Sequence, residues 1–291
     1  MSSMPQTGTR DEALDVTFVV TPSNSAVYES NFAASPLLAG LLGDRLILQE
    51  GYRSATLAYN DALDKAKTDL VVFCHQDVYF PETWLGDLRR SLEALAVSDP
   101  NWGVLGGFGA TRRPEWVGYL YSTGLGVMGR PFERPIEIET LDEYVLILRK
   151  SSGLRFDPNL PHFHFYGTDI CMTAREQGKR CYAISAFAVH NTSYGAVGPG
   201  FFEGCRYIAK RWRKFLPIQT TCVRVTRWNG DLVRRHTRQM CLRLLGKNMT
   251  PRPRLADPRS AASIRTAGEA TATGSQRSRG SHAEILVDRL I

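Results

Sequence analysis

The chain has 291 residues and a mass of 32.5 kDa, and 43% of its residues are apolar and 22% are charged. These proportions are those of an ordinary soluble globular protein, and the length is sufficient to bury a sizeable core. They exclude a collagen, a coiled coil, a disulfide mini-protein and a chain that is disordered throughout. The sequence also contains no run of about 18 consecutive apolar residues, which excludes a membrane-spanning helix.

The formal net charge of +7 is unevenly distributed along the chain. Residues 1–205 hold 17 basic and 24 acidic side chains, whereas residues 206–254 hold 14 basic side chains against Asp231 alone. An acidic body with one basic segment argues against a protein that coats nucleic acid over its whole surface. The distribution predicts one basic surface near the C-terminus that faces an anionic partner.

The six cysteines favour a reducing compartment. They form no CxxC pair, and Cys74 and Cys181 lie inside apolar runs that suit buried free thiols. Residues 1–15 lack both the basic region and the apolar region of a secretion signal. We therefore expect a cytoplasmic protein, with peripheral contact to a membrane as an option.

The first half of the chain alternates between strand and helix patterns. The clearest helix begins at Ser54, which can cap it, and continues to Lys67 with apolar residues at helical spacing. Residues 69–74 are apolar without alternation, which favours a parallel strand covered on both faces. Further elements are expected at 15–21 (strand), 25–40 (helix), 45–49 (strand), 83–97 (helix) and 102–107 (strand). This order predicts an α/β fold with a mostly parallel central sheet flanked by helices.

The second half is harder to divide into elements. Residues 108–165 are rich in glycine, proline and aromatic residues. We expect strands at 141–148 and 180–184 and helices at 167–178 and 202–213. One domain is expected over 15–249, between disordered ends at 1–14 and 250–291, because the second of these ends has few large apolar residues to offset the entropy of ordering.

Candidate site residues follow the predicted strands, because ligands of open α/β sheets bind beyond the carboxyl ends of the strands. These positions are 21–24, Glu50 and 75–77. Asp77, three residues after a buried run, suits a divalent cation that bridges two phosphates, or else an ordinary turn. The GxGxxG match at 124–129 is discounted because Arg130-Pro131 follows it and no helix can start there. The sequence also has no P-loop and no GxSxG elbow.

The segment His75-Gln76-Asp77-Val78, preceded by a hydrophobic run, resembles the metal-binding strand end of family-2-like glycosyltransferases of the GT-A fold. Their usual pattern is Asp-x-Asp, and a subgroup has His-Gln-Asp-Val. The resemblance implies that Asp77 holds Mn²⁺ or Mg²⁺ on a nucleoside diphosphate, with His75 in place of the first carboxylate and Gln76 beside it. It also implies a Rossmann-like GT-A sheet.

The resemblance extends toward the N-terminus, over the side of the site that binds the donor. Residues 17–24 resemble the segment that cradles the nucleobase and ribose, which implicates Thr21, Ser23 and Asn24. Glu50 matches an acidic position that contacts the base or ribose. Asn60 matches an asparagine that packs by the nucleotide, although a plain asparagine on the helix surface is an equal interpretation.

Residues 156–171 resemble the acceptor-side segment, which implicates His164 and Tyr166 there. The family places its catalytic aspartate where this chain has Gly167. The base is then Asp169, or Asp142 or Glu143, or no protein base is needed; Asp169 also suits a structural place in the first helical turn.

His190 follows a strand-like run at a position where the family has a metal or diphosphate ligand. It also fits a histidine that hydrogen-bonds a loop. Residues 206–218 resemble the subgroup too, and their basic and aromatic residues suit a membrane surface, a lipid-linked acceptor or a solvated helix face, with nucleic acid less favoured. We expect this basic part to extend over 206–249.

Taken together, the resemblance implies a glycosyltransferase that moves a sugar from a nucleoside-diphosphate sugar to a hydroxyl acceptor. It also implies inversion at the anomeric carbon, which is the family habit. The acceptor would be a cell-surface glycan or its lipid-linked precursor. The alternatives are an inactive homologue, a binder that uses residues 206–254, and a nucleotidyltransferase, whose usual Gly- and Lys-rich loop is missing after Val20. The sequence does not indicate the nucleotide, the sugar or the oligomeric state.

Overall fold

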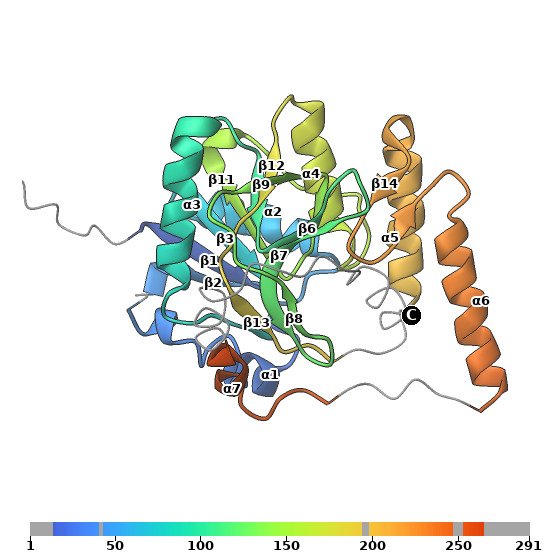
Figure 1. The fold of residues 1–291 in the computed structure, drawn as a ribbon, viewed down its shortest axis with the longest axis horizontal. Helices are drawn as coiled ribbons and strands as arrows, with labels where there is room; N and C mark the ends of the chain where they lie inside the picture. Colours follow the sequence, from blue (N-terminus) through green and yellow to red (C-terminus); the bar gives the residue numbers. More distant parts are fainter. Residues whose placement is uncertain (1–13, 41–42, 194–197, 247–252, 265–291) are drawn as a thin grey trace, which may run out of the picture.

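The computed structural model describes residues 14–40, 43–193, 198–246 and 253–264. Its centre is a seven-stranded sheet in which five strands run in one direction and β11 and β9 run in the other (Figure 1). The strand order is β2 (Leu46–Leu48), β1 (Val16–Val20), β3 (Leu70–Cys74), β11 (Val145–Arg149), β5 (Val104–Gly106), β12 (Cys181–Ala183) and β9 (Ile136–Ile138).

Helices cover both faces of this sheet, and each face has its own core. On one face, α2 (Ala55–Lys65) and α4 (Tyr166–Glu176) pack over Val71 and Phe73. On the other face, α3 (Trp84–Ser98) packs over Val72 and Cys74. Successive strand residues point to opposite faces, so an unbroken apolar run is the pattern of a strand buried on both sides. The predicted mostly parallel α/β sheet flanked by helices is confirmed.

A second sheet accounts for much of the region that the sequence pattern left unassigned. Its order is β10 (Thr140–Leu141), β6 (Phe108–Ala110), β7 (Trp116–Ser122), β13 (Ala188–His190) and β4 (Val78–Tyr79), with β8 (Gly126–Gly129) paired to β7. The GxGxxG match lies in the β7–β8 hairpin, where Gly124, Gly126 and Gly129 have positive φ. The glycines therefore serve a tight turn and not a dinucleotide.

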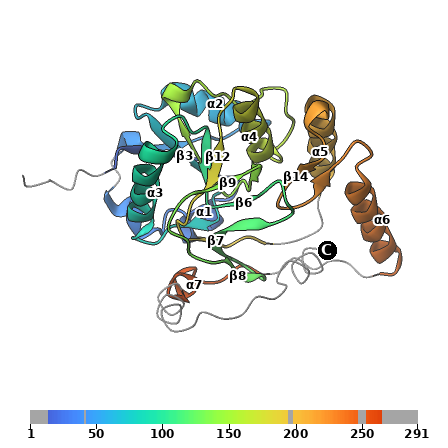
Figure 2. The same cartoon turned by 45° about the horizontal axis from the view of Figure 1, so that its top comes forward.

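The basic segment forms a separate layer at the end of the molecule away from α3 (Figures 1 and 2). It contains α5 (Pro199–Arg211), the 3₁₀ turn η4 (Arg213–Phe215), the hairpin β14 (Ile218–Gln219) and β15 (Arg224–Val225), and α6 (Gly230–Leu244). Among the described residues, no helix is both long and apolar enough to cross a membrane.

Three local expectations need correction. The region 25–40 is not one helix but α1 (Ser25–Ser30) followed by the 3₁₀ turn η1 (Pro36–Gly40), because a residue before proline avoids helical geometry. A second 3₁₀ turn, η2 (Gly43–Arg45), comes after this region. Ser54 precedes α2, but its hydroxyl bonds Thr56 and not a backbone amide. The tail expected to be disordered includes α7 (Arg259–Ala262), whose Ala261 is buried against β4, β7 and β13. Residues 1–13, 250–252 and 265–291 lie outside the described ranges.

Candidate metal and donor site

His75, Asp77 and His190 meet where the two sheets join. Residues 75–77 connect the end of β3 to β4, and β13 pairs with β4 so that His190 lies opposite Val78. The Nε2 atom of His190 is 3.5 Å from Asp77 Oδ1 and 3.4 Å from His75 Nδ1. One ligand atom from each of the three residues lies within 4.8 Å of the others. His190, more than 100 residues further along the chain, thus joins His75 and Asp77 in one cluster.

Backbone hydrogen bonds hold this connection from both sides. The amide of His75 donates to Tyr144 O at 3.1 Å, and the amide of Asn191 donates to Asp77 O at 2.8 Å. Tyr144 belongs to the turn before β11, and its ring stacks on His190 with centroids 5.5 Å apart. The loop that carries the cluster is therefore fixed by neighbours from both sheets.

Tyr166 sets the proton position on His75. Its hydroxyl donates to Glu143 O at 3.1 Å, so it accepts at its oxygen from His75 Nε2, 2.8 Å away. His75 Nδ1 is then the unprotonated nitrogen, and it faces Asp77 and His190. Burial, together with the neighbouring His190, lowers the pKa of His75 to about 4. The imidazole is thus neutral at neutral pH, with its lone pair directed at the cluster.

Asp77 and His190 share an electrostatic interaction. Burial alone would raise the pKa of Asp77, which is 7% exposed, but the charge and hydrogen bond of His190 hold it below its usual range. Burial would likewise lower the pKa of His190, and Asp77 outweighs this and raises it. A cation bound here would replace the proton that His190 shares with Asp77.

The donor set of the cluster fits a divalent transition metal. Imidazole nitrogens and one carboxylate oxygen suit Mn²⁺, whereas Mg²⁺ prefers oxygen ligands throughout. The carboxylate of Asp142 lies near the cluster, and its negative charge acts to raise the pKa of both His75 and His190. Thr221 holds Asp142 in place by donating to its Oδ2 at 2.8 Å.

Gln76 ties the first strand's turn to the cluster. Its Oε1 accepts from the amides of Ser23 and Asn24, both at 2.9 Å, and its Nε2 donates to Ser23 Oγ at 2.8 Å. Asn24 Oδ1 caps α1 by accepting from the Val27 amide. Hydrogen bonds thus bring Ser23, Asn24 and Gln76 together, and their polar groups shape the turn.

The other residues that the sequence predicts on the donor side, Thr21, Glu50 and Asn60, have different surroundings. Thr21 hydrogen-bonds the hydroxyl of Tyr59, and Glu50 lies exposed after β2. The Asn60 amide bonds Phe156 O at 2.8 Å and Phe156 N at 3.0 Å, so it fastens α2 to the loop before α4. These two hydrogen bonds give Asn60 a structural part in the fold.

Asp169, the predicted base, is enclosed by contacts within the protein. Its side chain is 0% exposed, and Trp212 Nε1 donates to its Oδ1 at 2.7 Å with Arg211 Nε 3.1 Å away. Arg211 ends α5 and Trp212 follows it, about 40 residues from Asp169 in the sequence, so local spacing does not predict the contact. Asp169 joins α4 to that segment.

The position of Gly167 explains why the carboxylate is missing there. A Cβ atom on Gly167 would lie 2.7 Å from Leu141 O and 3.0 Å from Glu143 Cγ. Glu143 instead occupies this space, and its carboxylate accepts from the Gly167 amide at 3.3 Å. Burial, with the nearby Asp142, raises the pKa of Glu143 well above its ordinary value.

The remaining acceptor-side residues lie along the loop into α4. His164 packs edge-on against Phe201 at 5.6 Å, and burial lowers its pKa. His162 Nε2 and Glu203 Oε2 form a hydrogen bond at 2.7 Å. A small cavity of about 40 Å³ lies beside Asp142, Glu143 and Thr221.

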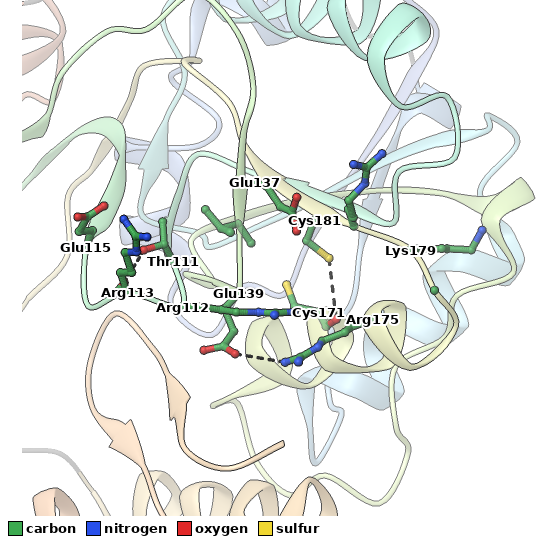
Figure 3. Close-up of a pocket in the computed structure, with 13 residues that line it drawn as sticks. Thr111, Arg112, Arg113, Glu115, Glu137, Glu139, Cys171, Arg175, Lys179 and Cys181 are labelled. Atoms are coloured by element: carbon green, nitrogen blue, oxygen red, sulfur yellow. Dashed lines mark hydrogen bonds and ion pairs between the residues drawn. The ribbon is translucent and has the colours of Figure 1, made fainter. Parts of the chain in front are cut away.

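A larger pocket of about 570 Å³ lies elsewhere and contains none of the predicted site residues (Figure 3). Its charged lining carries both signs, and Arg175 in it pairs with Glu139 at 3.3 Å. Cys171 and Cys181 approach each other there, with the Cys181 thiol 3.9 Å from Cys171 O. The pocket's charges are thus partly satisfied within the protein.

Comparison with known proteins gives distant similarities. No family model matches the chain. The ATP synthase subunits region ORF 6 of Fuscovulum blasticum is 30% identical over 164 residues, which are 55% of this chain and 66%, just under two thirds, of that relative. S. aureus TarS 1–349 in complex with UDP-GlcNAc has a TM-score of 0.43 at 16% identity, over 67% of this chain and 66% of TarS. Mannosyltransferase PcManGT from Pyrobaculum calidifontis, in complex with GDP-Man and Mn²⁺, has a TM-score of 0.41 at 13% identity. The match covers 94% of this chain and 78% of that protein.

The tautomer of His75 can be tested with Tyr166→Phe. Loss of the hydroxyl removes the acceptor for His75 Nε2–H, so we expect Mn²⁺ affinity to fall by roughly tenfold or more, as for other residues that orient metal ligands. Isothermal titration with Mn²⁺ measures it. Tyr182→Phe, which loses a hydrogen bond to Asp99 outside the cluster, is the control. Equal Mn²⁺ affinity in Tyr166→Phe and wild type would contradict the assignment.

The environment of Asp169 predicts a pH effect on stability. Burial raises the pKa of Asp169 to about 7, against the lowering by the Trp212 bond. The native carboxyl then holds its proton more tightly than the unfolded one, so its contribution to the free energy of unfolding falls as pH rises from about 4 to 7. We expect wild type to lose stability relative to Asp169→Asn across this window in urea titrations. A stability difference between wild type and Asp169→Asn that stays constant over this pH range would show that Arg211 keeps Asp169 ionised.

Proposed function

We propose that the protein is a glycosyltransferase that moves a sugar from a nucleoside-diphosphate sugar to a hydroxyl acceptor. The observation that carries this proposal is the cluster of His75, Asp77 and His190 beyond the carboxyl end of β3. The Gln76-bound turn at Ser23 and Asn24 lies directly beside it. This is where an open α/β sheet binds its ligand, and the sequence around Asp77 is the one that resembles the GT-A metal motif.

Donor binding in this proposal divides between the cluster and the first turn. His75, Asp77 and His190 would hold a divalent cation, which supplies positive charge to the departing diphosphate. The turn at Thr21, Ser23 and Asn24 contacts the nucleoside, with Glu50 at the next strand end. Tyr166 keeps His75 in its coordinating tautomer, and Asn191 keeps Asp77 in place.

Glu143 is the base that we propose for the acceptor hydroxyl, in place of Asp169. It occupies the space next to Gly167, at the start of α4, and lines the small cavity with Asp142. Burial raises the pKa of Glu143, and a carboxylate with a raised pKa is a stronger base than an ordinary one. Direct displacement with inversion follows from a single base on the acceptor side. His164 and Tyr166 lie on the same loop and helix start.

The acceptor is proposed to be a cell-surface glycan or its lipid-linked precursor, reached through peripheral membrane contact of residues 206–249. Apolar side chains of α6 and the following turn are exposed beside arginines, notably Met240, Leu244 and Leu245. Trp228 is also exposed, with Arg227 against its ring. Exposed apolar and basic residues on one helix suit an anionic bilayer surface.

The donor proposal predicts nucleotide-dependent stabilisation that requires Asp77. In a thermal-shift screen with UDP, GDP, dTDP and CMP, we expect one nucleotide to raise the melting temperature in the presence of Mn²⁺, because a ligand of the native state stabilises it. Asp77→Ala should lose the shift, and Asp64→Ala, which removes an exposed carboxylate of α2, should keep it. A folded wild type that responds to none of the four nucleotides would contradict the proposal. Metal-dependent hydrolysis of the matching nucleotide sugar separates an enzyme from an inactive homologue.

The membrane contact predicts binding to anionic vesicles. The double variant Met240→Glu, Leu244→Glu should reduce co-sedimentation with phosphatidylserine vesicles at least several-fold, because it places charge on the exposed apolar face. Val97→Glu, at an exposed apolar residue of α3, is the matched control. Binding that is equal in both variants would remove α6 from the contact.

A further inference from the structure

Residues 253–264 form a strap across the second sheet. Asn191 holds its start: the amide of Leu255 donates to Asn191 Oδ1 at 2.7 Å, and Asn191 Nδ2 donates to Leu255 O at 3.0 Å. Ala261, 2% exposed, holds its end by packing with Tyr79, Tyr119, Phe187 and Val189. The strap is thus anchored at two points, one directly after His190 and one on the sheet surface.

The strap carries Arg254 to the metal carboxylate. Arg254 Nη2 lies 3.5 Å from Asp77 Oδ2, whereas His190 Nε2 and His75 Nδ1 lie 3.5 and 4.0 Å from the other oxygen, Oδ1. The two oxygens of Asp77 therefore face different partners. The guanidinium lies beside the His75–Asp77–His190 cluster and not among its three ligand atoms.

Part of the Arg254 guanidinium stays open for a ligand. Its side chain is 36% exposed, and one nitrogen approaches Asp77. An arginine carries five N–H donors in a planar fork that matches phosphate oxygens. A donor group fixed next to a metal carboxylate and still reachable is the arrangement expected of a phosphate contact.

We propose that Arg254 binds the diphosphate of the donor next to the cation, so that the strap forms part of the donor site; this inference rests on the proposed function. A divalent cation partly neutralised by Asp77 supplies less positive charge than a diphosphate carries negative charge. Arg254 makes up part of the difference. Without a diphosphate the same guanidinium repels a cation at the cluster, since like charges lie close together.

The experiment compares two titrations of wild type and Arg254→Ala: Mn²⁺ alone, and the preformed manganese–pyrophosphate complex. The effects should have opposite signs. Loss of the guanidinium should weaken pyrophosphate binding by roughly tenfold, the usual scale of a charged hydrogen bond. It should tighten the binding of Mn²⁺ alone by a few-fold. Arg254→Lys should lie between wild type and alanine in the pyrophosphate titration.

Two further variants test whether the effect is specific to Arg254 and whether the strap holds Arg254 in place. Arg259→Ala removes another cation of the strap, one paired with Asp257, and should change neither titration. Ala261→Glu disturbs the distant anchor while Arg254 is retained, and it should reproduce the loss of pyrophosphate affinity.

Each contrary result has its own meaning. If wild type binds manganese–pyrophosphate and Arg254→Ala binds it equally well, the inference is wrong and the proposed function stands. If the variant binds both probes more tightly, Arg254 blocks the site, which also overturns the inference. If folded wild type binds Mn²⁺ but no pyrophosphate and no nucleoside diphosphate, the proposed function fails and the inference fails with it.

Discussion

The pairing of β4 with β13 is the contact on which the candidate site depends. It sets His190 opposite Val78 and lets the Asn191 amide bond the carbonyl of Asp77. A strand that slips by one residue turns every side chain to the opposite face. The parallel pairing of β13 with β7 restrains the same strand from its other edge, so both sheet neighbours fix the register that brings His190 to the cluster.

Electrostatics then explain why the neighbours of Asp77 are cationic or able to become so. A buried carboxylate is costly unless charge or hydrogen bonds compensate it. Asp77 receives this compensation from His190 on one oxygen and Arg254 on the other. The first partner can exchange its proton for a metal ion, while the second keeps its charge at all relevant pH values. A metal ion can therefore replace the proton of His190 while Arg254 stays in place beside Asp77, which suits a site that binds and releases a cation.

The sequence predicts the parts of this structure that are encoded locally. The unbroken apolar run of β3 indicates a doubly covered strand, and the three residues that follow it indicate the site. What it cannot supply are pairings between distant short strands: β4, β6, β8 and β13 are two to four residues long and carry too little periodicity to be recognised. Asn191 takes part only because β13 pairs with β4, and Arg254 because the next residue, Leu255, hydrogen-bonds Asn191, so no local pattern singles them out.

Asp169 shows the same limit at a single position. Its place in the first turn of α4 suits a base or a structural role equally, and what decides is Trp212, which lies 43 residues further along the chain. Nearby, the lack of space at Gly167 decides where a carboxylate can stand. Glu143 reaches the start of α4 from the turn between β10 and β11, and the backbone amides there donate to its carboxylate as they would to an acidic residue of the helix itself. Glu143 thus places a carboxylate at the start of α4 from another element, so a glycine at position 167 does not leave this place without an acidic group.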